Sequence, residues 1–170
     1  MKAAFFVVGL IAAASALYLP SVDPTTELQQ IANGMFEQAG LADPTTIISC
    51  FTGDSPQQTV DFVRNLTDNL ADQQYFKILN IVLTYKKNSD PAVTKCLANN
   101  TEFHEAAVAY GTSNLTLMGL SKKVEQYVIA NVQTIHSSFV ELDNQLQQGN
   151  YDAYGRDAGA LLQAVMASNE

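Results

Sequence analysis

Basic side chains are scarce in this 170-residue chain, which has 9 Lys and Arg against 17 Asp and Glu and a formal net charge of −8. Nucleic-acid binding depends on contacts between basic side chains and phosphates, so the composition argues against a nucleic-acid partner. Hydrophobic residues make up 47% of the chain, which is ordinary for a globular protein and excludes a disordered one. The length is that of one domain.

Long apolar runs are absent except at the amino end. There, a short positive start precedes an uncharged apolar stretch, and residues 14–16 (Ala-Ser-Ala) have the small side chains that signal peptidase accepts. This pattern predicts a signal peptide over residues 1–16 and a single helical domain over residues 17–170. The alternative is a membrane anchor, but the run ends near Leu19, short of the roughly 20 residues that span a bilayer. We therefore expect a secreted protein, extracellular or in the lumen of the secretory pathway, without a transmembrane segment.

Cysteine is rare as well, since Cys50 and Cys96 are the only two. In an oxidising compartment an isolated pair is most simply a disulfide. Two buried thiols, or one reactive nucleophile, are the alternatives. We expect the Cα atoms to lie within about 4.4–6.8 Å of each other, the range of an unstrained bridge. Two helices of similar length between the cysteines would return the chain to its starting end.

No stretch alternates apolar and polar residues with the two-residue period of a strand. We therefore expect an all-α bundle with two long antiparallel helix pairs and short connecting helices. Asp-Pro and Ser-Pro pairs mark four predicted helix starts, because Asp and Ser cap a first turn and Pro fits its first position. These pairs are Asp23-Pro24, Asp43-Pro44, Ser55-Pro56 and Asp90-Pro91. The predicted helices begin at or span residues 24–39, 44–51, 56–71, 73–87, 91 onwards, 102–110, 124–146 and 151–166.

Three of these segments carry further expectations. The segment over residues 73–87 is apolar nearly all round, which is typical of a central helix. Over residues 124–146, apolar residues recur every three or four positions, which predicts one helix of about six turns ended by Gly149. In the last segment, Gly155 and Gly159 lie one turn apart, and this spacing lets two helices approach closely.

Three Asn-x-Thr sequons, at Asn65, Asn99 and Asn114, are candidate glycosylation sites. Asn65 falls on the polar side of a predicted helix, and Asn114 falls in a loop. Asn99 lies only three residues from Cys96, where a disulfide would crowd the transferase. We therefore expect Asn65 and Asn114 to accept glycans better than Asn99.

No motif for catalysis or metal binding is complete. His104 begins a sequence like the zinc-protease helix motif, but the second histidine is replaced by Val108. His136 follows Ile135 and precedes Ser137 and Ser138 in mid-helix, where no sharp turn exposes a nucleophile. Glu102 and Glu105 are interpreted as solvated first-turn residues that complement a helix dipole. We therefore predict no catalytic residue, metal or cofactor, and expect that the protein is not an enzyme.

Two functions remain open. The first is a non-catalytic secreted helical protein that acts as an interaction or structural module, with an unknown protein partner. The alternative is a carrier of a small apolar ligand, a lipid or fatty acid bound between helices. A filled core would equally explain the aromatic residues that motivate the carrier hypothesis. The candidate ligand-lining residues are Phe51, Tyr75, Phe76 and Phe103.

Overall fold

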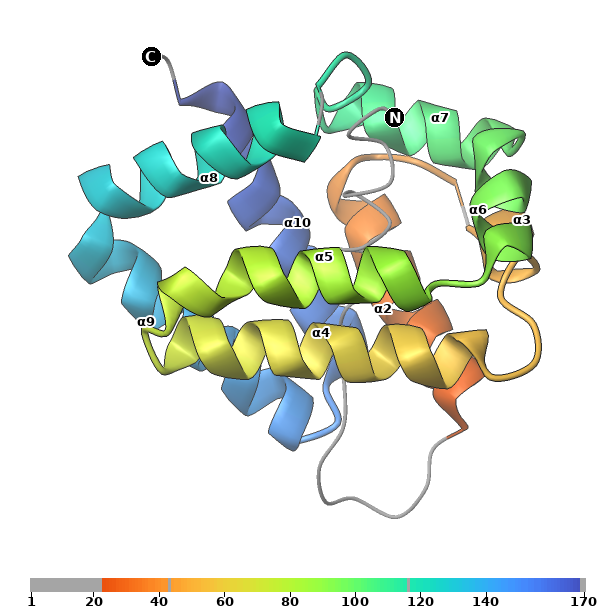
Figure 1. The fold of residues 1–170 in the computed structure, drawn as a ribbon, viewed down its shortest axis with the longest axis horizontal. Helices are drawn as coiled ribbons and strands as arrows, with labels where there is room; N and C mark the ends of the chain where they lie inside the picture. Colours follow the sequence, from red (N-terminus) through yellow and green to blue (C-terminus); the bar gives the residue numbers. More distant parts are fainter. Residues whose placement is uncertain (1–22, 43, 116, 169–170) are drawn as a thin grey trace.

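A computed structural model describes residues 23–42, 44–115 and 117–168 of the protein. In these ranges the chain forms nine α-helices, one short 3-10 helix and no β-strand, which confirms the all-α prediction (Figure 1). The predicted signal peptide lies outside the described residues. The elements are α2 (Pro24–Gln38), α3 (Thr45–Ile48), α4 (Ser55–Ala71), η1 (Tyr75–Lys77), α5 (Ile78–Asn88), α6 (Pro91–Ala98), α7 (Thr101–Ala109), α8 (Leu117–Ala130), α9 (Val132–Gln147) and α10 (Tyr151–Ala167). No helix among them is long and apolar enough to cross a membrane.

Helices begin within one residue of all four predicted starts, and the predicted side-chain cap is confirmed at two of them. The side chain of Asp23 accepts a hydrogen bond from the amide of Thr26 (3.2 Å), and that of Asp90 accepts one from Ala92 (2.8 Å). Ser55 does not act as a cap, because its hydroxyl donates to the carbonyl of Thr52 (2.6 Å) and α4 begins at Ser55 itself. The fourth capping residue, at position 43, lies outside the described residues.

The first and last helices, α2 and α10, touch through their backbones at glycine. A Cβ atom added to Gly155 would lie 2.1 Å from the carbonyl oxygen of Ile31, and one added to Gly34 would lie 2.1 Å from that of Asp152. Real Cβ atoms do not approach other atoms so closely, so neither position has room for a side chain. The predicted close approach of two helices is confirmed at Gly155, whereas a Cβ atom added to Gly159 would meet the hydroxyl of Tyr110 and the side chain of Gln38. We call Gly34, Gly155 and Gly159 the glycine seam.

The two helices of the glycine seam run in the same direction. Tyr151 at the start of α10 donates to Glu27 near the start of α2 (2.9 Å), and Gln163 near the end of α10 pairs with Gln38 at the end of α2 (3.3 Å). The expected arrangement of two long antiparallel pairs is therefore not confirmed. In Figure 1 both helices lie behind α4 and α5. Buried apolar side chains from α2, α4, α7, α9 and α10 form one continuous core.

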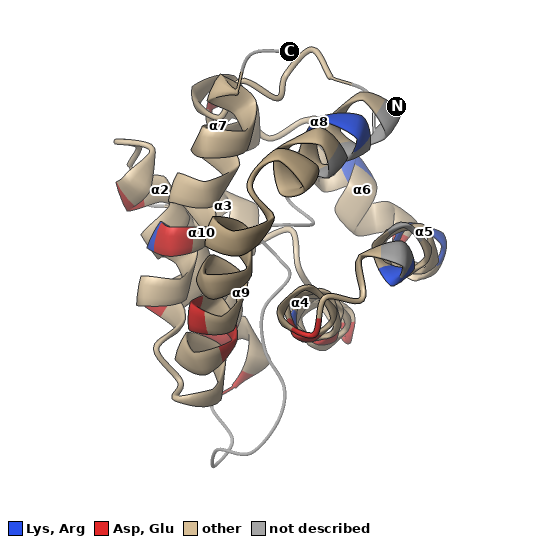
Figure 2. Ribbon diagram, turned by 90° about the vertical axis from the view of Figure 1, so that its left-hand side faces the viewer, with Lys and Arg blue, Asp and Glu red and all other residues tan. Residues whose placement is uncertain are grey.

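Helix α5 is at the edge of the molecule, and its predicted central position was wrong. Leu83 is 45% exposed, Ile78 and Ile81 are only partly buried, and Val82 is buried. In Figure 2, α5 lies beyond α4 on the side away from α2 and α10. The reason is that the centre is filled by the glycine seam, whose lack of side chains allows the closest packing. The apolar pattern of one helix does not show whether that helix is buried more deeply than the others.

The chain from residue 124 to 146 is broken at Asn131, so the prediction of one long helix was wrong. Asn131 has φ −127° and ψ 28°, outside the helical range, and its side-chain amide donates to the carbonyl of Tyr127 (2.9 Å). A short amide side chain competes for backbone carbonyls in this way and ends helices. Helix α9 therefore leaves α8 at an angle, as Figure 1 shows.

A disulfide joins Cys50, which follows α3, to Cys96 in α6, with a Cα–Cα distance of 5.6 Å. This confirms the predicted pairing and its expected distance. Beside it, Glu102 of α7 accepts hydrogen bonds from the amides of Thr46 and Ile47 at 3.0 and 3.1 Å. The carboxylate of Glu102 thus caps α3, a role that its interpretation as a solvated first-turn residue missed.

Candidate functional site

The two histidines lie in different surroundings, one exposed and one half-buried. His104 on α7 is exposed, and its Nε2 lies 2.9 Å from the carbonyl oxygen of Ala98. His136 on α9 is half-buried, and within the described residues its Nδ1 has no hydrogen-bond partner. Ser137 and Ser138, which follow His136, donate to the carbonyl of Thr134, at 2.7 and 3.3 Å. In the described ranges, no three His, Cys, Asp or Glu residues come together where they could hold a metal ion.

The candidate ligand-lining residues do not form one pocket. Phe51 is buried beside the disulfide, whereas Tyr75 begins η1 at the opposite end of α4. The 17 residues of α4 separate them, about 25 Å at 1.5 Å per residue. Phe103 is buried on α7, and the side chain of Phe76 lies outside what the structure describes.

An open groove lies between α4 on one side and η1 and α5 on the other, and we call it the α4–α5 groove. Its volume is about 660 Å3. Both walls follow from helical periodicity, because the lining residues recur every three or four positions on each helix. At its floor, the rings of Phe62 and Tyr85 stack with centroids 4.2 Å apart. The lining residues are Gln58, Asp61, Phe62, Asn65, Asn69, Lys77, Asn80, Ile81, Thr84, Tyr85 and Asn88.

The α4–α5 groove is lined mainly by hydrogen-bonding side chains. The pKa of Tyr85 is raised, and burial is the largest cause. The hydrogen bond between the hydroxyls of Tyr85 and Thr59 (2.8 Å) partly opposes this rise. Tyr85 therefore stays neutral at physiological pH. Asn65, a glycosylation candidate, lies in the groove wall and is exposed. The arrangement offers amide and hydroxyl groups beside an aromatic floor, which suits a neutral polar ligand.

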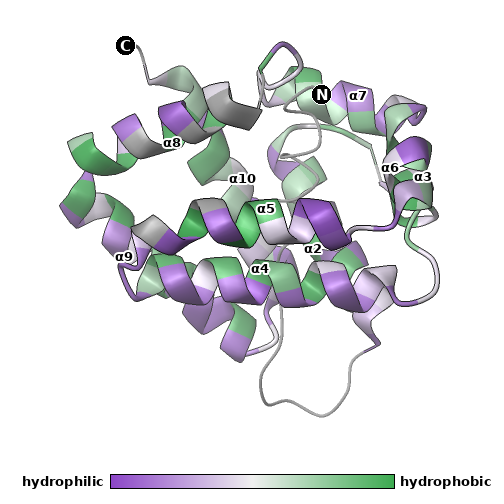
Figure 3. Cartoon of the chain, in the orientation of Figure 1, coloured by the Kyte–Doolittle hydropathy of each residue, from purple (hydrophilic) through white to green (hydrophobic). Residues whose placement is uncertain are grey.

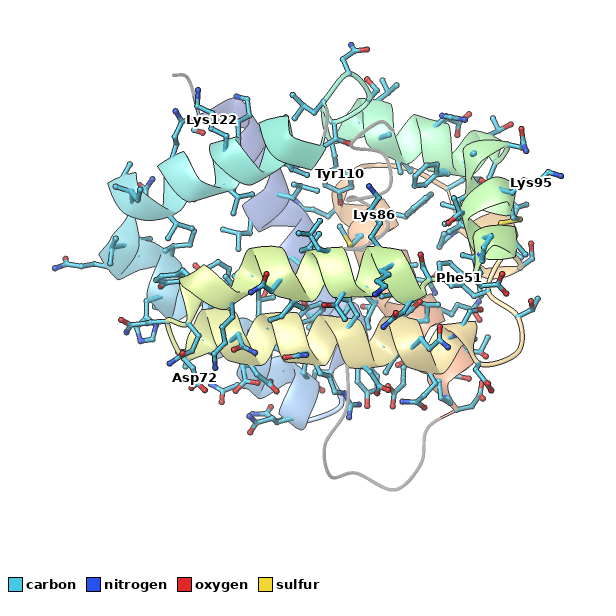
Figure 4. All side chains as sticks on the ribbon, in the orientation of Figure 1. Phe51, Asp72, Lys86, Lys95, Tyr110 and Lys122 are labelled. Carbon is cyan, nitrogen blue, oxygen red and sulfur yellow. A yellow bond between two sulfur atoms is a disulfide. The ribbon has the colours of Figure 1, made fainter. Side chains whose placement is uncertain are left out.

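Lysines gather on one side of the molecule although the chain as a whole is acidic. Figure 2 shows the basic residues of α5, α6 and α8 on one side and most acidic residues on α4, α9, α10 and α2. In Figure 4, Lys86 extends from α5 on the side away from α4, and Asp72 lies at the far end of α4. Counting charges along the sequence missed this separation. The lysines of the basic side are Lys77, Lys86, Lys87, Lys95, Lys122 and Lys123.

The two arginines do not belong to the basic side, because both form ion pairs elsewhere. Arg64 pairs with Glu27 at 3.2 Å between α4 and α2, and both side chains are largely buried. The hydroxyl of Tyr151 also donates to Glu27 (2.9 Å). Arg156 pairs on the surface with Glu37 (3.0 Å) and with an aspartate on its own helix. The buried Arg64–Glu27 pair is a structural link that the sequence analysis missed.

Apolar side chains are exposed at the junction of α8 with α9 and midway along α9. Ile129 is 69% exposed, Val132 47% and Val140 37%. In Figure 3 the ribbon where α8 meets α9 is coloured as hydrophobic. We call these three residues the α8–α9 ridge. Lys122 lies seven residues before Ile129, which places it two turns away on the same face of α8.

Two carboxyl groups approach each other between α4 and α9. The pKa of Asp68 is raised from 3.8 to about 6, first by partial burial, then by its hydrogen bond with Asp143 and by repulsion from Asp143 and Asp72. Asp143 also accepts a hydrogen bond from Gln147 (2.6 Å). Asp68 is therefore protonated in mildly acidic solution. The two residues are 75 positions apart in the chain, so no local sequence pattern indicates this contact.

Comparisons with known proteins add no assignment. No protein family model matches the chain, and no curated protein or solved structure does so either.

Proposed function

We propose that this is a secreted, non-catalytic interaction module that binds a protein partner through the α8–α9 ridge. The exposure of Ile129 and Val132 carries the proposal. Both are large apolar side chains at a helix junction, and burying them against a partner would release the water that now covers them. The predicted signal peptide and the Cys50–Cys96 disulfide support a secretory route.

The charges around the ridge indicate the chemistry of the partner. Lys122 shares the outer face of α8 with Ile129, and the other lysines continue along α5 and α6 on the same side of the molecule (Figure 2). A partner with an apolar segment flanked by acidic residues would fit this surface. Electrostatic attraction of that kind raises the association rate and weakens with added salt.

Capture from the native extracellular fluid tests the proposal. The mature chain and an Ile129→Glu, Val132→Glu variant are immobilised, and the bound proteins are identified by mass spectrometry. Because both side chains are exposed, the variant keeps its fold, and its helical circular dichroism checks this. We expect at least one acidic protein to bind the natural chain and to be lost from the variant, with binding that weakens between low and high salt.

A matched control separates the ridge from general stickiness. Val108 on α7 is 66% exposed and lies outside the ridge, so Val108→Glu removes the same kind of group elsewhere. It should leave binding unchanged. Light scattering over a range of concentrations then distinguishes a second copy of the chain from a different partner. A chain that stays monomeric and captures nothing that the ridge variant loses would contradict the proposal.

A further inference from the structure

We propose that the α4–α5 groove holds the first sugars of an N-linked glycan attached to Asn65. The inference rests on the secretory route of the proposed function, because the attachment takes place there. It does not depend on the α8–α9 ridge or on any protein partner. Asn65 lies in the wall of the groove, so a glycan on its side chain starts inside the site that it would occupy.

In the folded chain the side chain of Asn65 is held so that a sugar on its nitrogen would break no hydrogen bond. The Nδ2 atom of Asn69 donates to Oδ1 of Asn65 (2.8 Å) and also to the backbone carbonyl of Asn65 (2.7 Å). These contacts fix the amide oxygen. Within the described residues, Nδ2 of Asn65 makes no hydrogen bond, and it is the atom that carries an N-linked sugar.

The other two sequons differ from Asn65. Asn99 donates through Nδ2 to the carbonyl of Lys95 (2.9 Å), so in the folded chain its amide nitrogen is engaged. Asn114 is exposed in the loop that follows α7 and does not line the groove. Asn65 therefore combines an available nitrogen with an adjoining site, a combination that neither of the other two has.

The attachment itself is a group transfer from a lipid-pyrophosphate oligosaccharide, catalysed by the transferase of the secretory pathway. A bond forms between Nδ2 of Asn65 and C1 of the sugar. The bond from C1 to the pyrophosphate oxygen breaks, the lipid pyrophosphate leaves, and Nδ2 loses one proton. Thr67 completes the sequon, but it is buried in the fold and its hydroxyl bonds with that of Tyr154 (2.9 Å). The transfer therefore precedes the packing of α4.

The lining of the groove matches the surface of a sugar. Hydroxyl and acetamido groups need both donors and acceptors, which Asn80, Thr84 and Asp61 provide. The less polar face of a sugar ring needs an apolar contact, which Ile81 and the Phe62–Tyr85 stack provide. The volume of about 660 Å3 lies in the range of small-molecule sites, roughly 300–1,000 Å3.

The test uses the protein secreted from a eukaryotic host. Peptide mapping first gives the occupancy at Asn65 and Asn114. The native protein is then treated with an endoglycosidase, and the release rate at each site is compared with the rate in denatured chain. We expect release at Asn65 to be about tenfold slower in the native than in the denatured protein, because the sugars must first leave the groove. At Asn114 the two rates should be similar.

Two variants on α5 connect this protection to the groove. Asn80→Ala with Thr84→Ala removes exposed polar groups from its wall, and alanine keeps the helix intact. Release at Asn65 should then approach the denatured rate. Lys86→Ala with Lys87→Ala changes the same helix outside the groove and should leave the protection unchanged.

The outcomes also separate this inference from the secretory route. A glycan at Asn114 with none at Asn65 would overturn the inference and leave secretion standing. A glycan at Asn65 that is released equally fast in native and denatured protein would overturn it too. Absence of glycan from all three sequons would overturn it, and an amino terminus still at Met1 in that material would remove the secretory route as well.

Discussion

The contact between α2 and α10 differs from that between α4 and α5 in what separates the helices. At the glycine seam nothing does, since the missing Cβ atoms of Gly34 and Gly155 let backbone touch backbone. Between α4 and α5, side chains form the contact, with two stacked rings and a hydroxyl pair under an open groove. The glycine seam leaves no room for an added side chain, whereas the α4–α5 pair faces solvent on one side. Changes in volume should therefore be costly at the first contact and tolerated at the second.

Gly155→Leu tests the seam most severely. Its Cβ atom alone would overlap the carbonyl oxygen of Ile31, and backbone cannot move aside as a flexible side chain can. We expect a loss of about 5 kcal/mol or more, beyond the usual 1–3 kcal/mol for overpacking, and hence loss of cooperative unfolding. Urea denaturation followed by circular dichroism measures it.

The control for this substitution is Gly53→Ala. Gly53 has φ +60° but no atom within 4 Å of an added Cβ. Only the backbone conformation is then penalised, by about 1–2 kcal/mol. A Gly155 variant no less stable than the Gly53 variant would show that the two backbones are not in contact.

The disulfide lies away from both contacts, and its removal should have the next largest effect. Cys50→Ser with Cys96→Ser releases a loop with a sequence separation of 46, which corresponds to about 4 kcal/mol at most in the chain-entropy model. The seam stays intact, so the melting temperature should fall while the helical circular-dichroism signal remains. Thiol labelling of the native protein is the direct check. Two reactive thiols in the native secreted protein would contradict the bridge.

How well a feature of this fold can be predicted depends on how far apart in the sequence the interacting residues lie. Local rules succeeded, because capping by Asp23 and Asp90 involves atoms within three residues of each other. The disulfide was also predictable, since a compartment and a count of two leave one simple pairing. Gly155 indicated a close helix contact. Its counterpart Gly34 lies inside the predicted helix over residues 24–39, where no local pattern indicates a contact. The pairing of α2 with α10 joins opposite ends of the chain, so a local pattern cannot reveal it.

Contacts between distant segments account for the predictions that failed. The apolar pattern of α5 describes one helix, whereas burial depends on what competes for the centre. The carboxylate of Glu102 caps α3 by accepting from Ile47, 55 residues earlier in the chain, and no local sequence pattern predicts this contact. One signal was available at Glu27, which lies four residues before Ile31 on the buried stripe of α2. A carboxylate in that position requires a partner, and Arg64 is that partner.

A third contact, between α4 and α9, should depend on pH. The raised pKa of Asp68, about 6 against 3.8, means that the folded state favours its protonated form. The resulting stability is fully present below the unfolded pKa and is lost as the pH rises through about 6. Because the group is partly solvated, screening reduces the effect to about 1 kcal/mol between pH 4 and pH 7.5.

Asp143→Asn should flatten this dependence. It removes the repulsion and offers an amide donor to an ionised Asp68, so the pKa of Asp68 falls. Melting temperatures measured from pH 4 to pH 8 provide the comparison, and Asp61→Asn, on the exposed side of α4, is the control. An unchanged pH profile in the Asp143 variant would show that the two carboxyl groups do not interact. Attraction by Arg64 opposes the rise of the Asp68 pKa in both proteins.

The smallest effect is expected at Leu83→Lys on α5, and it bears most directly on the comparison. Leu83 is half-exposed, so a lysine can lay its carbon chain over the same surface and keep its charge in water. Lysine is also a good helix former, so the free energy of unfolding should change by no more than about 0.5 kcal/mol. The same substitution at Leu28 of α2, which is 0% exposed, would bury a charge beside the seam and should unfold the protein. Thermal unfolding of both variants decides the point. A loss of about 2 kcal/mol or more at Leu83 would mean that the outer face of α5 is covered in solution, and the contrast between a crowded seam and an open hairpin would then be wrong.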